Sequence, residues 1–315
     1  MRMHLTDREI VITGGCGLVG AALAEALAPQ NTIRVIDDLS KGDKTVLPAD
    51  CTLIEGDVAD PTVCAAGITE TTDLVIHAAA LTATNHPDPR ALFTANTNMT
   101  YTVAARAAAV GVGGIVFTSS STVYGEAPRP TPESHTPLAP ISVYGAAKVA
   151  DEAIISALAS TAEIPVWIFR FANVVGPHQR GTVIPDFIEK LRADPNRLEI
   201  LGDGTQTKSY LHVDDCIAAM LHQIETIDEP LWVCNLGTAD ATDVTSIAEI
   251  VCEQMGVDPA FSYTGGQRGW QGDVPQMQLA IDRLLDSGFT PRDDSTAAIE
   301  RATTQLLAEF DQPLV

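Results

Sequence analysis

Tyr144 and Lys148 stand four residues apart in the segment SVYGAAK, inside an alanine-rich stretch that predicts a helix over residues 142–160. Four residues are slightly more than one helical turn, so both side chains project from the same face. An ammonium beside a phenol favours the phenolate and lowers the phenol pKa from its usual value of about 10. The pair therefore predicts a proton acceptor for a sugar or alcohol hydroxyl. Such a spacing also occurs by chance, so the prediction depends on the surrounding segments.

A nucleotide-binding loop is predicted near the start of the sequence. A β-branched strand over residues 9–13 stops at the loop GGCGLVG, and a helical pattern follows over residues 18–27. Gly14, Gly17 and Gly20 have the spacing that allows a tight turn, close approach to a pyrophosphate and close packing of helix on strand. The first N–H groups of that helix would attract the phosphate charge.

A carboxylate follows the second predicted strand, residues 32–36. Asp37 can accept hydrogen bonds from both ribose hydroxyls and would repel a 2′-phosphate, which favours NAD over NADP. Lys41 and Lys44 follow closely and would instead help NADP to bind, so this alternative stays open.

Two more candidate cofactor-binding positions follow the third and fourth predicted strands, residues 52–55 and 73–77. Asp57 follows the third strand and could bind the adenine amino group. Ala78 follows the fourth strand, where a small residue lets the chain pass close to a cofactor. We interpret His77 as a packed structural histidine.

Strands and helices alternate up to residue 173, with further predicted elements at residues 88–110, 114–118, 142–160 and 166–170. Such alternation implies parallel strands joined by right-handed crossovers. The sequence therefore predicts an α/β fold: a doubly wound parallel-sheet Rossmann domain over residues 1–173 and a smaller C-terminal α/β substrate domain over residues 174–315. Part of the segment 212–237 is expected to pack back onto the first domain. The later elements are predicted at residues 183–193, 214–225, 231–236, 245–255 and 295–310.

The net charge of −22 argues against nucleic acid and anionic membranes as partners, because such a surface repels phosphates. The basic residues are 14 arginines and five lysines. Strong acidity with few lysines resembles the composition of proteins from salt-loving archaea, and such a halophilic surface predicts stability that rises in molar salt. An ordinary acidic bacterial enzyme is the alternative.

The six cysteines are scattered, without CxxC pairs or His-Cys clusters at ligand spacing. This pattern predicts a reduced, cytoplasmic protein without a metal site. The first residues lack the apolar core of a signal peptide, and no run of 18 apolar residues predicts a membrane span.

Motifs along nearly the whole chain resemble the extended short-chain dehydrogenase/reductase family, most closely its nucleotide-sugar epimerases of the UDP-glucose 4-epimerase type. In chain order they are TGGCGLVG, IDDLSKG, GDVAD, HAAA, TSSSTVYGE, YGAAK, RFANVVGP, GDGTQTKSYLHVDD and RGWQGDVP. The resemblance implies NAD as cofactor and a nucleotide sugar as substrate. It also implies a homodimer, in which the helices predicted at 88–110 and 142–160 pair between subunits. The implied NAD-contacting residues are Gly14, Gly17, Gly20, Asp37, Asp57, Val58, Ala78, Asn96, Tyr144 and Lys148.

The resemblance also assigns the catalytic and substrate-binding roles. Ser120 takes the place of the catalytic serine or threonine, Tyr144 that of the base, and Lys148 that of the lysine that holds the nicotinamide ribose. Asn173 matches a residue that contacts the substrate diphosphate. The implied reaction is epimerisation at C4 of the sugar through a transient 4-keto intermediate.

Two positions depart from the family pattern in the phosphate-binding segments. Lys208 replaces an arginine, so it meets a phosphate as a point charge without a bidentate fork. Trp270 stands where the family has a second arginine, and Arg268 two residues earlier could reach the same phosphate. Trp270 either stacks on the uracil or sugar, or serves simple packing, which we favour.

A few residues favour or disfavour the other activities found in this family. Dehydratases and decarboxylases of this family carry carboxylates where this chain has Ser121 and Thr122, and hydroxyls cannot replace a carboxylic acid in that role. A net NAD(P)-dependent reductase or dehydrogenase would use the same triad of side chains. A non-catalytic NAD-binding protein is disfavoured because Tyr144 and Lys148 are both present.

Overall fold

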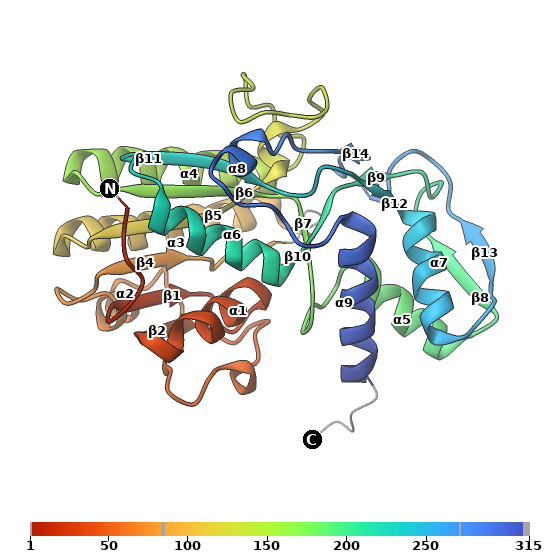
Figure 1. The fold of residues 1–315 in the computed structure, drawn as a ribbon, viewed down its shortest axis with the longest axis horizontal. Helices are drawn as coiled ribbons and strands as arrows, with labels where there is room; N and C mark the ends of the chain where they lie inside the picture. Colours follow the sequence, from red (N-terminus) through yellow and green to blue (C-terminus); the bar gives the residue numbers. More distant parts are fainter. Residues whose placement is uncertain (1, 83–85, 271, 311–315) are drawn as a thin grey trace.

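A seven-stranded sheet, with all its strands parallel, forms the centre of the molecule in the order β11-β6-β5-β4-β1-β2-β3 (Figure 1). The computed structural model describes residues 2–82, 86–270 and 272–310. The strands are β1 (Glu9–Thr13), β2 (Thr32–Asp37), β3 (Thr52–Glu55), β4 (Leu74–His77), β5 (Gly114–Ser120), β6 (Val166–Phe171) and β11 (Leu231–Leu236). The order reverses on either side of β1, which confirms the predicted doubly wound parallel sheet.

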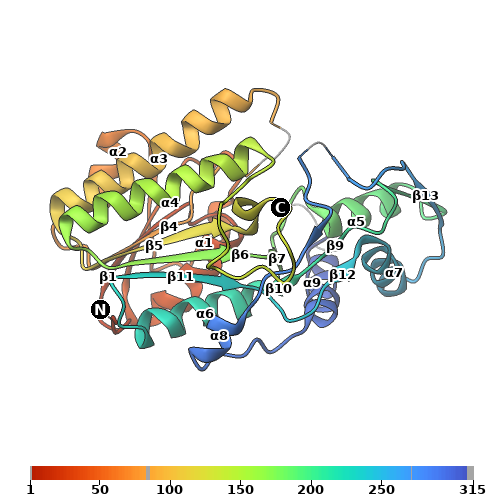
Figure 2. The same ribbon diagram turned by 90° about the horizontal axis from the view of Figure 1, so that it is seen from above.

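Helices cover both faces of this sheet (Figure 2). On one face lie α1 (Leu18–Leu27) and α6 (Val213–Thr226), and on the other α2 (Pro61–Gly67), α3 (Pro89–Val110) and α4 (Val143–Ala162). The segment from 212 to 237 therefore supplies helix α6 to one face of the sheet and strand β11 to its edge.

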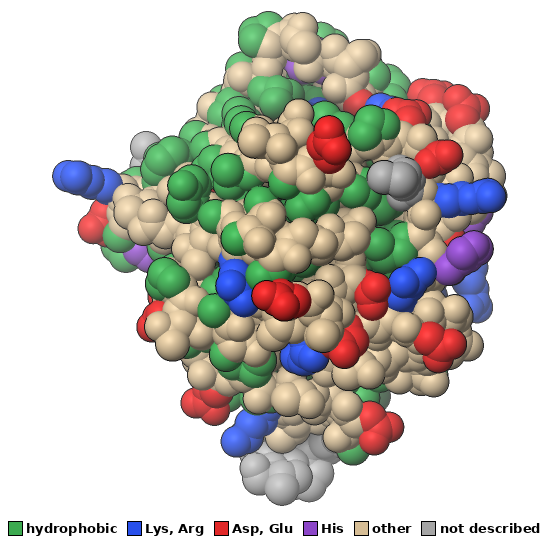
Figure 3. All heavy atoms as spheres, turned by 90° about the vertical axis from the view of Figure 1, so that its left-hand side faces the viewer, with side chains coloured by type: hydrophobic (Ala, Val, Ile, Leu, Met, Phe, Trp, Pro, Cys, Tyr) green, Lys and Arg blue, Asp and Glu red, His purple; other side chains and the backbone are tan. Residues whose placement is uncertain are grey.

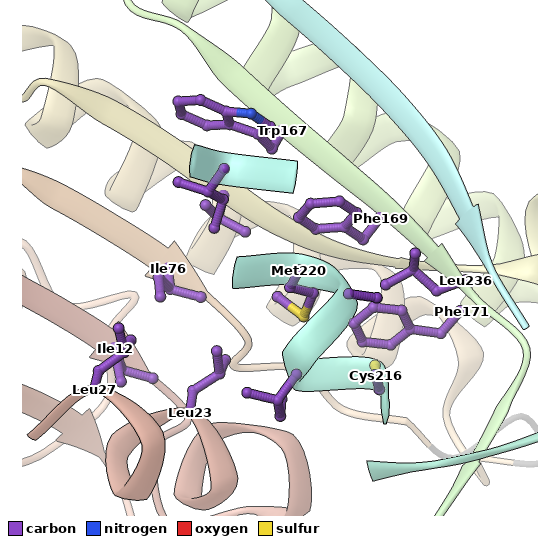
Figure 4. Close-up of a cluster of buried hydrophobic side chains, with 14 of the residues drawn as sticks. Ile12, Leu23, Leu27, Ile76, Trp167, Phe169, Phe171, Cys216, Met220 and Leu236 are labelled. Carbon is purple, nitrogen blue, oxygen red and sulfur yellow. The ribbon is translucent and has the colours of Figure 1, made fainter. Parts of the chain in front are cut away.

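Residues of β1 alternate between two apolar cores, one on each face. Ile10 and Ile12 pack toward α1 and α6, whereas Val11 packs toward α3 and α4. Figure 4 shows the first core, in which Leu23 of α1 and Met220 of α6 meet the side chains of the sheet. Strands buried on both faces are typical of parallel sheets, which explains their continuous apolar runs.

A second unit with its own apolar core lies beyond the edge where the strands of the large sheet end (Figure 1). Ile188, Leu198, Ile247 and Ile299 belong to this core. Its elements are α5 (Val183–Ala193), α7 (Val244–Met255), α9 (Ser295–Phe310) and the parallel strands β8 (Arg197–Ile200) and β13 (Ala260–Tyr263).

Short strands join the two units. Strand β7 (Asn173–Val175) pairs with β10 (Tyr210–His212), and β9 (Thr207–Lys208) lies between β12 (Thr242–Asp243) and β14 (Gln276–Met277). The remaining elements are α8 (Asp282–Asp286) and the 3₁₀ turns η1 (Ala28–Gln30), η2 (Lys44–Val46) and η3 (Ser121–Tyr124).

Acidic and basic side chains are scattered over the face drawn in Figure 3, with apolar side chains between them. On this face the excess of acid is thus spread out and forms no single patch. Among the described helices, none combines the length and apolar character needed to cross a membrane.

Candidate active site

The three glycines of the first loop each meet a different steric demand. Gly14 has a left-handed φ of 68°, and a Cβ there would lie 2.6 Å from the Cα of Ala79. A Cβ on Gly20 would lie 2.2 Å from the carbonyl oxygen of Gly14, so the helix packs directly on the loop. A Cβ on Gly17 would come no closer than 3.5 Å to any atom considered, and this residue caps α1 without a side-chain hydrogen bond. The tight turn thus lets the backbone and the start of α1 approach a pyrophosphate closely, as expected for a site that binds NAD.

Asp37 fixes the end of β2 to this loop. Its buried carboxylate accepts hydrogen bonds from the backbone N–H groups of Cys16 and Leu39, both at 2.9 Å. Each carboxylate oxygen has a second lone pair, so ribose hydroxyls can still be bound. Lys41 and Lys44 are exposed in the segment that follows.

Two predicted cofactor residues shape the neighbouring loops. The exposed Asp57 carboxylate accepts from the N–H of Ala59 at 2.8 Å, and Val58 is buried in the core beneath α2 and α3. The buried Asn96 amide bonds the backbone of Leu81 twice, at 2.8 and 3.0 Å. Asn96 therefore holds the loop that follows β4 and Ala78, and its direct contact with NAD stays a prediction.

The three predicted catalytic residues converge at the edge where β5 ends and α4 begins. Ser142 caps α4 by accepting from the N–H of Gly145 at 3.1 Å, which starts the helix just before Tyr144. The Ser120 side chain lies close to the Tyr144 phenol and favours its ionised form, and Lys148 Nζ lies 5.9 Å from the centroid of the tyrosine ring. Ser120 also accepts from the Thr122 hydroxyl at 3.0 Å, so its own O–H is available as a donor.

Lys148 is almost fully buried beneath the tyrosine. Its Nζ donates to the carbonyl oxygen of Thr118 at 2.8 Å and lies 4.5 Å from the centroid of the Phe117 ring. Burial lowers the pKa of Lys148 to about 8, although Asp151 and Glu152 oppose the change. The ammonium form still predominates at neutral pH.

The predicted lowering of the tyrosine pKa is wrong for the chain by itself. Burial raises the pKa of Tyr144 to about 12, against the opposing effect of the hydrogen bond with Ser120. The spacing of four residues does bring Lys148 to the same helix face. Its ammonium is directed to Thr118 and Phe117, however, so desolvation of the phenol decides the sign.

A second polar cluster lies between β9 and the segment before β14. Lys208 Nζ donates to the Asp273 carboxylate at 2.6 Å and lies 4.9 Å from the centroid of the Trp270 ring. Arg268 bonds the carbonyl oxygen of Asp273 and pairs with Glu126 at 2.5 Å. Lys208 and Arg268 are thus brought together. Trp270 is 41% exposed, contrary to our packing interpretation.

Asn173 and a polar cavity lie among the short strands and loops that join the two units. Asn173 pairs with Tyr210 across β7 and β10, and its side chain opposes the rise that burial causes in the tyrosine pKa. A cavity of about 360 Å³ is lined in part by Glu126, the ion-pair partner of Arg268. Its lining comprises Glu126, Ala127, Arg129, Asp203, Thr205, Gln206, Gln267, Pro275 and Gln276.

Sequence reasoning missed two buried groups that support the site. Asp273 is the acceptor that gathers Lys208 and Arg268, and the aspartate of the GDVP motif was the available signal. Glu152 binds Arg170 through both oxygens, at 2.9 and 2.7 Å, directly behind the catalytic strand end. Its position four residues after Lys148 was the signal, since it places Glu152 on the buried side of α4.

The glycine loop, the Asp37 carboxylate and the pair of Tyr144 and Lys148 lie at one edge of a parallel sheet, as in enzymes that exchange hydride with a bound dinucleotide. The chain belongs to the NAD dependent epimerase/dehydratase family, whose model matches residues 10–237. This membership confirms the predicted cofactor, NAD.

Curated relatives include both epimerases and dehydratases. The chain is 27% identical over 301 residues to a putative UDP-glucose 4-epimerase of Methanocaldococcus jannaschii, covering 93% of this chain and 96% of the relative. It is 28% identical over 313 residues to a dTDP-glucose 4,6-dehydratase of Streptomyces antibioticus, covering 93% and 90%.

Solved structures give the same family likeness. A UDP-galactose 4-epimerase superposes with a TM-score of 0.87 at 38% identity, covering 96% of this chain and 100% of the other. A UDP-glucose 4-epimerase from Thermotoga maritima, solved with UDP-glucose, has a TM-score of 0.87 at 26% identity and the same coverage.

Proposed function

We propose that this protein catalyses NAD-dependent epimerisation at C4 of a nucleotide sugar of the UDP-glucose and UDP-galactose type. The observation that carries the proposal is the convergence of Ser120, Tyr144 and Lys148 at the sheet edge that also holds the glycine loop. The likeness to a UDP-galactose 4-epimerase at 38% identity supports the choice of substrate class.

In this mechanism Tyr144 takes the proton from the sugar 4-hydroxyl while Ser120 donates a hydrogen bond to the reacting oxygen. NAD⁺ held by the glycine loop and Asp37 would supply a hydride acceptor for C4 and a donor for the return of the hydride. Lys148 holds the nicotinamide ribose and adds its own charge beneath Tyr144. After the 4-keto sugar has turned over in the pocket, Tyr144 returns the proton to the same oxygen.

The two packing units divide the binding work in this proposal. Residues 1–173, joined by part of 212–237, bind NAD through the loops at the strand ends. Residues 174–315 otherwise bind the nucleotide sugar. The cofactor contacts are assigned to Gly14, Gly17, Gly20, Asp37, Asp57, Val58, Ala78, Asn96, Tyr144 and Lys148.

Lys208 and Arg268 are proposed to bind the diphosphate, with Asn173 nearby. Asp273 holds both cations in place before substrate arrives, since each donates a hydrogen bond to this residue.

Dehydration is disfavoured by the residues that follow the catalytic serine. Ser121 is buried at 8% exposure, and the Thr122 hydroxyl donates to Ser120 at 3.0 Å. Neither side chain has an acid of suitable pKa for eliminating a hydroxyl. The dehydratase relatives therefore share the oxidation of C4 with this chain in our proposal, and not the elimination.

The test is turnover without added cofactor. Purified protein incubated with UDP-galactose is expected to yield UDP-glucose until the two reach equilibrium, because each cycle restores NAD⁺. Chromatographic separation of the nucleotide sugars measures the product, with the N-acetyl forms as parallel substrates. Consumption of added NAD(P)H with a keto sugar, and no conversion without it, would instead indicate a net reductase.

We also propose a homodimer built on α3 and α4. Both helices expose apolar side chains to solvent in the isolated chain, including Phe93, Tyr101 and Val143. Pairing of these faces would bury them in a four-helix bundle. Light scattering is expected to give about twice the chain mass of 33.3 kDa, and a mass equal to one chain would contradict the pairing.

A further inference from the structure

A chain of buried hydrogen bonds runs beneath the active site, from the loop after β4 to helix α4. The N–H of Ala79 lies 3.3 Å from the Thr13 hydroxyl, which lies 2.7 Å from Nδ1 of His77. The other ring nitrogen, Nε2, lies 3.1 Å from the Thr100 hydroxyl. Burial raises the pKa of the Asp151 carboxyl, and the nearby Thr100 hydroxyl opposes that rise. The Thr13, His77, Thr100 and Asp151 side chains are all at most 1% exposed.

The direction of this chain follows from an ionised Asp151, which can only accept. Thr100 then directs its O–H toward the carboxylate and accepts from Nε2–H of His77. Nδ1 of His77 therefore accepts from Thr13, whose oxygen accepts the N–H of Ala79. Burial lowers the pKa of His77 to about 3, so the ring is neutral, as this assignment requires.

Asp151 has an acceptor to spare next to the catalytic lysine. It stands three residues after Lys148, so both side chains share the buried face of α4. Within the described part of the chain, its Oδ1 has no hydrogen-bond partner. The adjacent carboxylate, Glu152, is already bound by Arg170 at both oxygens.

We infer that Asp151 is a positioning residue whose buried carboxylate, which faces Thr100 at the end of this chain, supplies the counter-charge that keeps Lys148 protonated beneath Tyr144. The inference rests on the proposed function, since it gives a role to Asp151 in holding the charge on which the tyrosine depends. It also connects the backbone of the cofactor loop with that charge, and gives His77 a purpose beyond packing.

Among the described residues, few charged groups face Asp151, so its own charge has a strong effect on the protonation of Lys148. Lys148 and Glu152 act on it from α4, while His77 from β4 is neutral and Thr100 from α3 carries no charge. Burial raises the pKa of Asp151 to about 6, so the carboxylate is ionised at neutral pH and above. Removing this negative charge disfavours the ammonium form of Lys148, which lowers the pKa of the lysine further.

The test measures the lysine directly and needs no turnover. The chain has only five lysines, so labelling lysine Cε with ¹³C gives five NMR resonances, and the one lost in Lys148→Met is that of Lys148. In Asp151→Asn, the titration midpoint of Lys148 is expected to fall by about one pH unit or more. An unchanged midpoint in the folded variant overturns the inference.

Asp186→Asn is the matched control, because Asp186 pairs with Lys190 on the surface of α5 at 2.7 Å. It is expected to leave the Lys148 midpoint unchanged. Thr100→Val is a second variant, which removes the donor to Asp151 and leaves the carboxyl in place. It is expected to move the midpoint in the same direction by less, and a movement in the opposite direction counts against the inference.

The pH profile of kcat/KM gives an independent readout. In Asp151→Asn the alkaline fall in rate is expected to begin about one pH unit lower than in the unmodified enzyme, with near-normal rates at pH 6.5. If the enzyme proves inactive on every nucleotide sugar, the proposed function fails while the NMR titration still decides the role of Asp151. If it is active and the titration and the rate profile are both unmoved, the inference alone fails.

Discussion

Replacing Tyr144 with phenylalanine is expected to lower kcat by about 10²–10⁴-fold, because the variant lacks the group that takes and returns the sugar proton. The phenol lies close to Ser120, and its ring stands above the Lys148 ammonium. Phenylalanine keeps the ring, so the variant is expected to fold and to retain NAD. Initial rates of UDP-galactose conversion measure the loss, and the cofactor released on denaturation measures NAD content.

Tyr263→Phe is a suitable control for this substitution. Tyr263 is 45% exposed at the end of β13, and its hydroxyl makes one long hydrogen bond of 3.4 Å with Thr245. Removing that hydroxyl is expected to leave kcat unchanged. A Tyr144→Phe variant as fast as the unmodified enzyme would remove the proposed base, and would favour the non-catalytic NAD-binding alternative.

The parts of the molecule that follow local patterns could be predicted from the sequence. The strands of the large sheet are apolar runs that end at loop residues, and the predicted ranges differ from β1 and β3 by no residue at either end. Helix α3 ends at Gly111, which adopts a left-handed φ of 72° as a C-terminal cap. The glycine loop could also be predicted, because the spacing of its three glycines is itself a local pattern.

The elements that were missed depend on partners distant in sequence or are too short to show a period. Strands β9 and β14 have two residues each and exist because Thr207 pairs with Gln276 across the chain. Helix α2 was missed although Asp60 caps it and Pro61 begins it, because seven residues show little apolar periodicity.

The direction of the Tyr144 pKa shift could not be predicted from the sequence, because it depends on how deeply the phenol is buried. A spacing of four residues predicts that Tyr144 and Lys148 lie close, and they do. It does not reveal that the phenol is desolvated or that Lys148 donates to Thr118. Similarly, the Asp273 contacts that gather Lys208 and Arg268 arise from the folded loop.

The largest expected effect on stability comes from the ion pair behind the catalytic strand end. Glu152 and Arg170 have side chains only 9% and 7% exposed, and Glu152 also accepts from Ser119 at 2.5 Å. Replacing Glu152 with alanine leaves the Arg170 guanidinium buried without its counter-charge. The free energy of unfolding is therefore expected to fall by about 3–5 kcal/mol, measured by denaturant titration.

Two further variants separate the buried charge from other losses. Arg170→Met combined with Glu152→Ala removes both charges, so it is expected to be more stable than Glu152→Ala alone, despite losing more hydrogen bonds. Asp186→Ala breaks a pair whose side chains are 44% and 31% exposed, and is expected to cost about 1 kcal/mol or less. Equal losses in Glu152→Ala and Asp186→Ala would contradict this account. In that case Arg170 would have to find another acceptor or water, and the strand end that carries Ser120 would depend less on this pair than its burial implies.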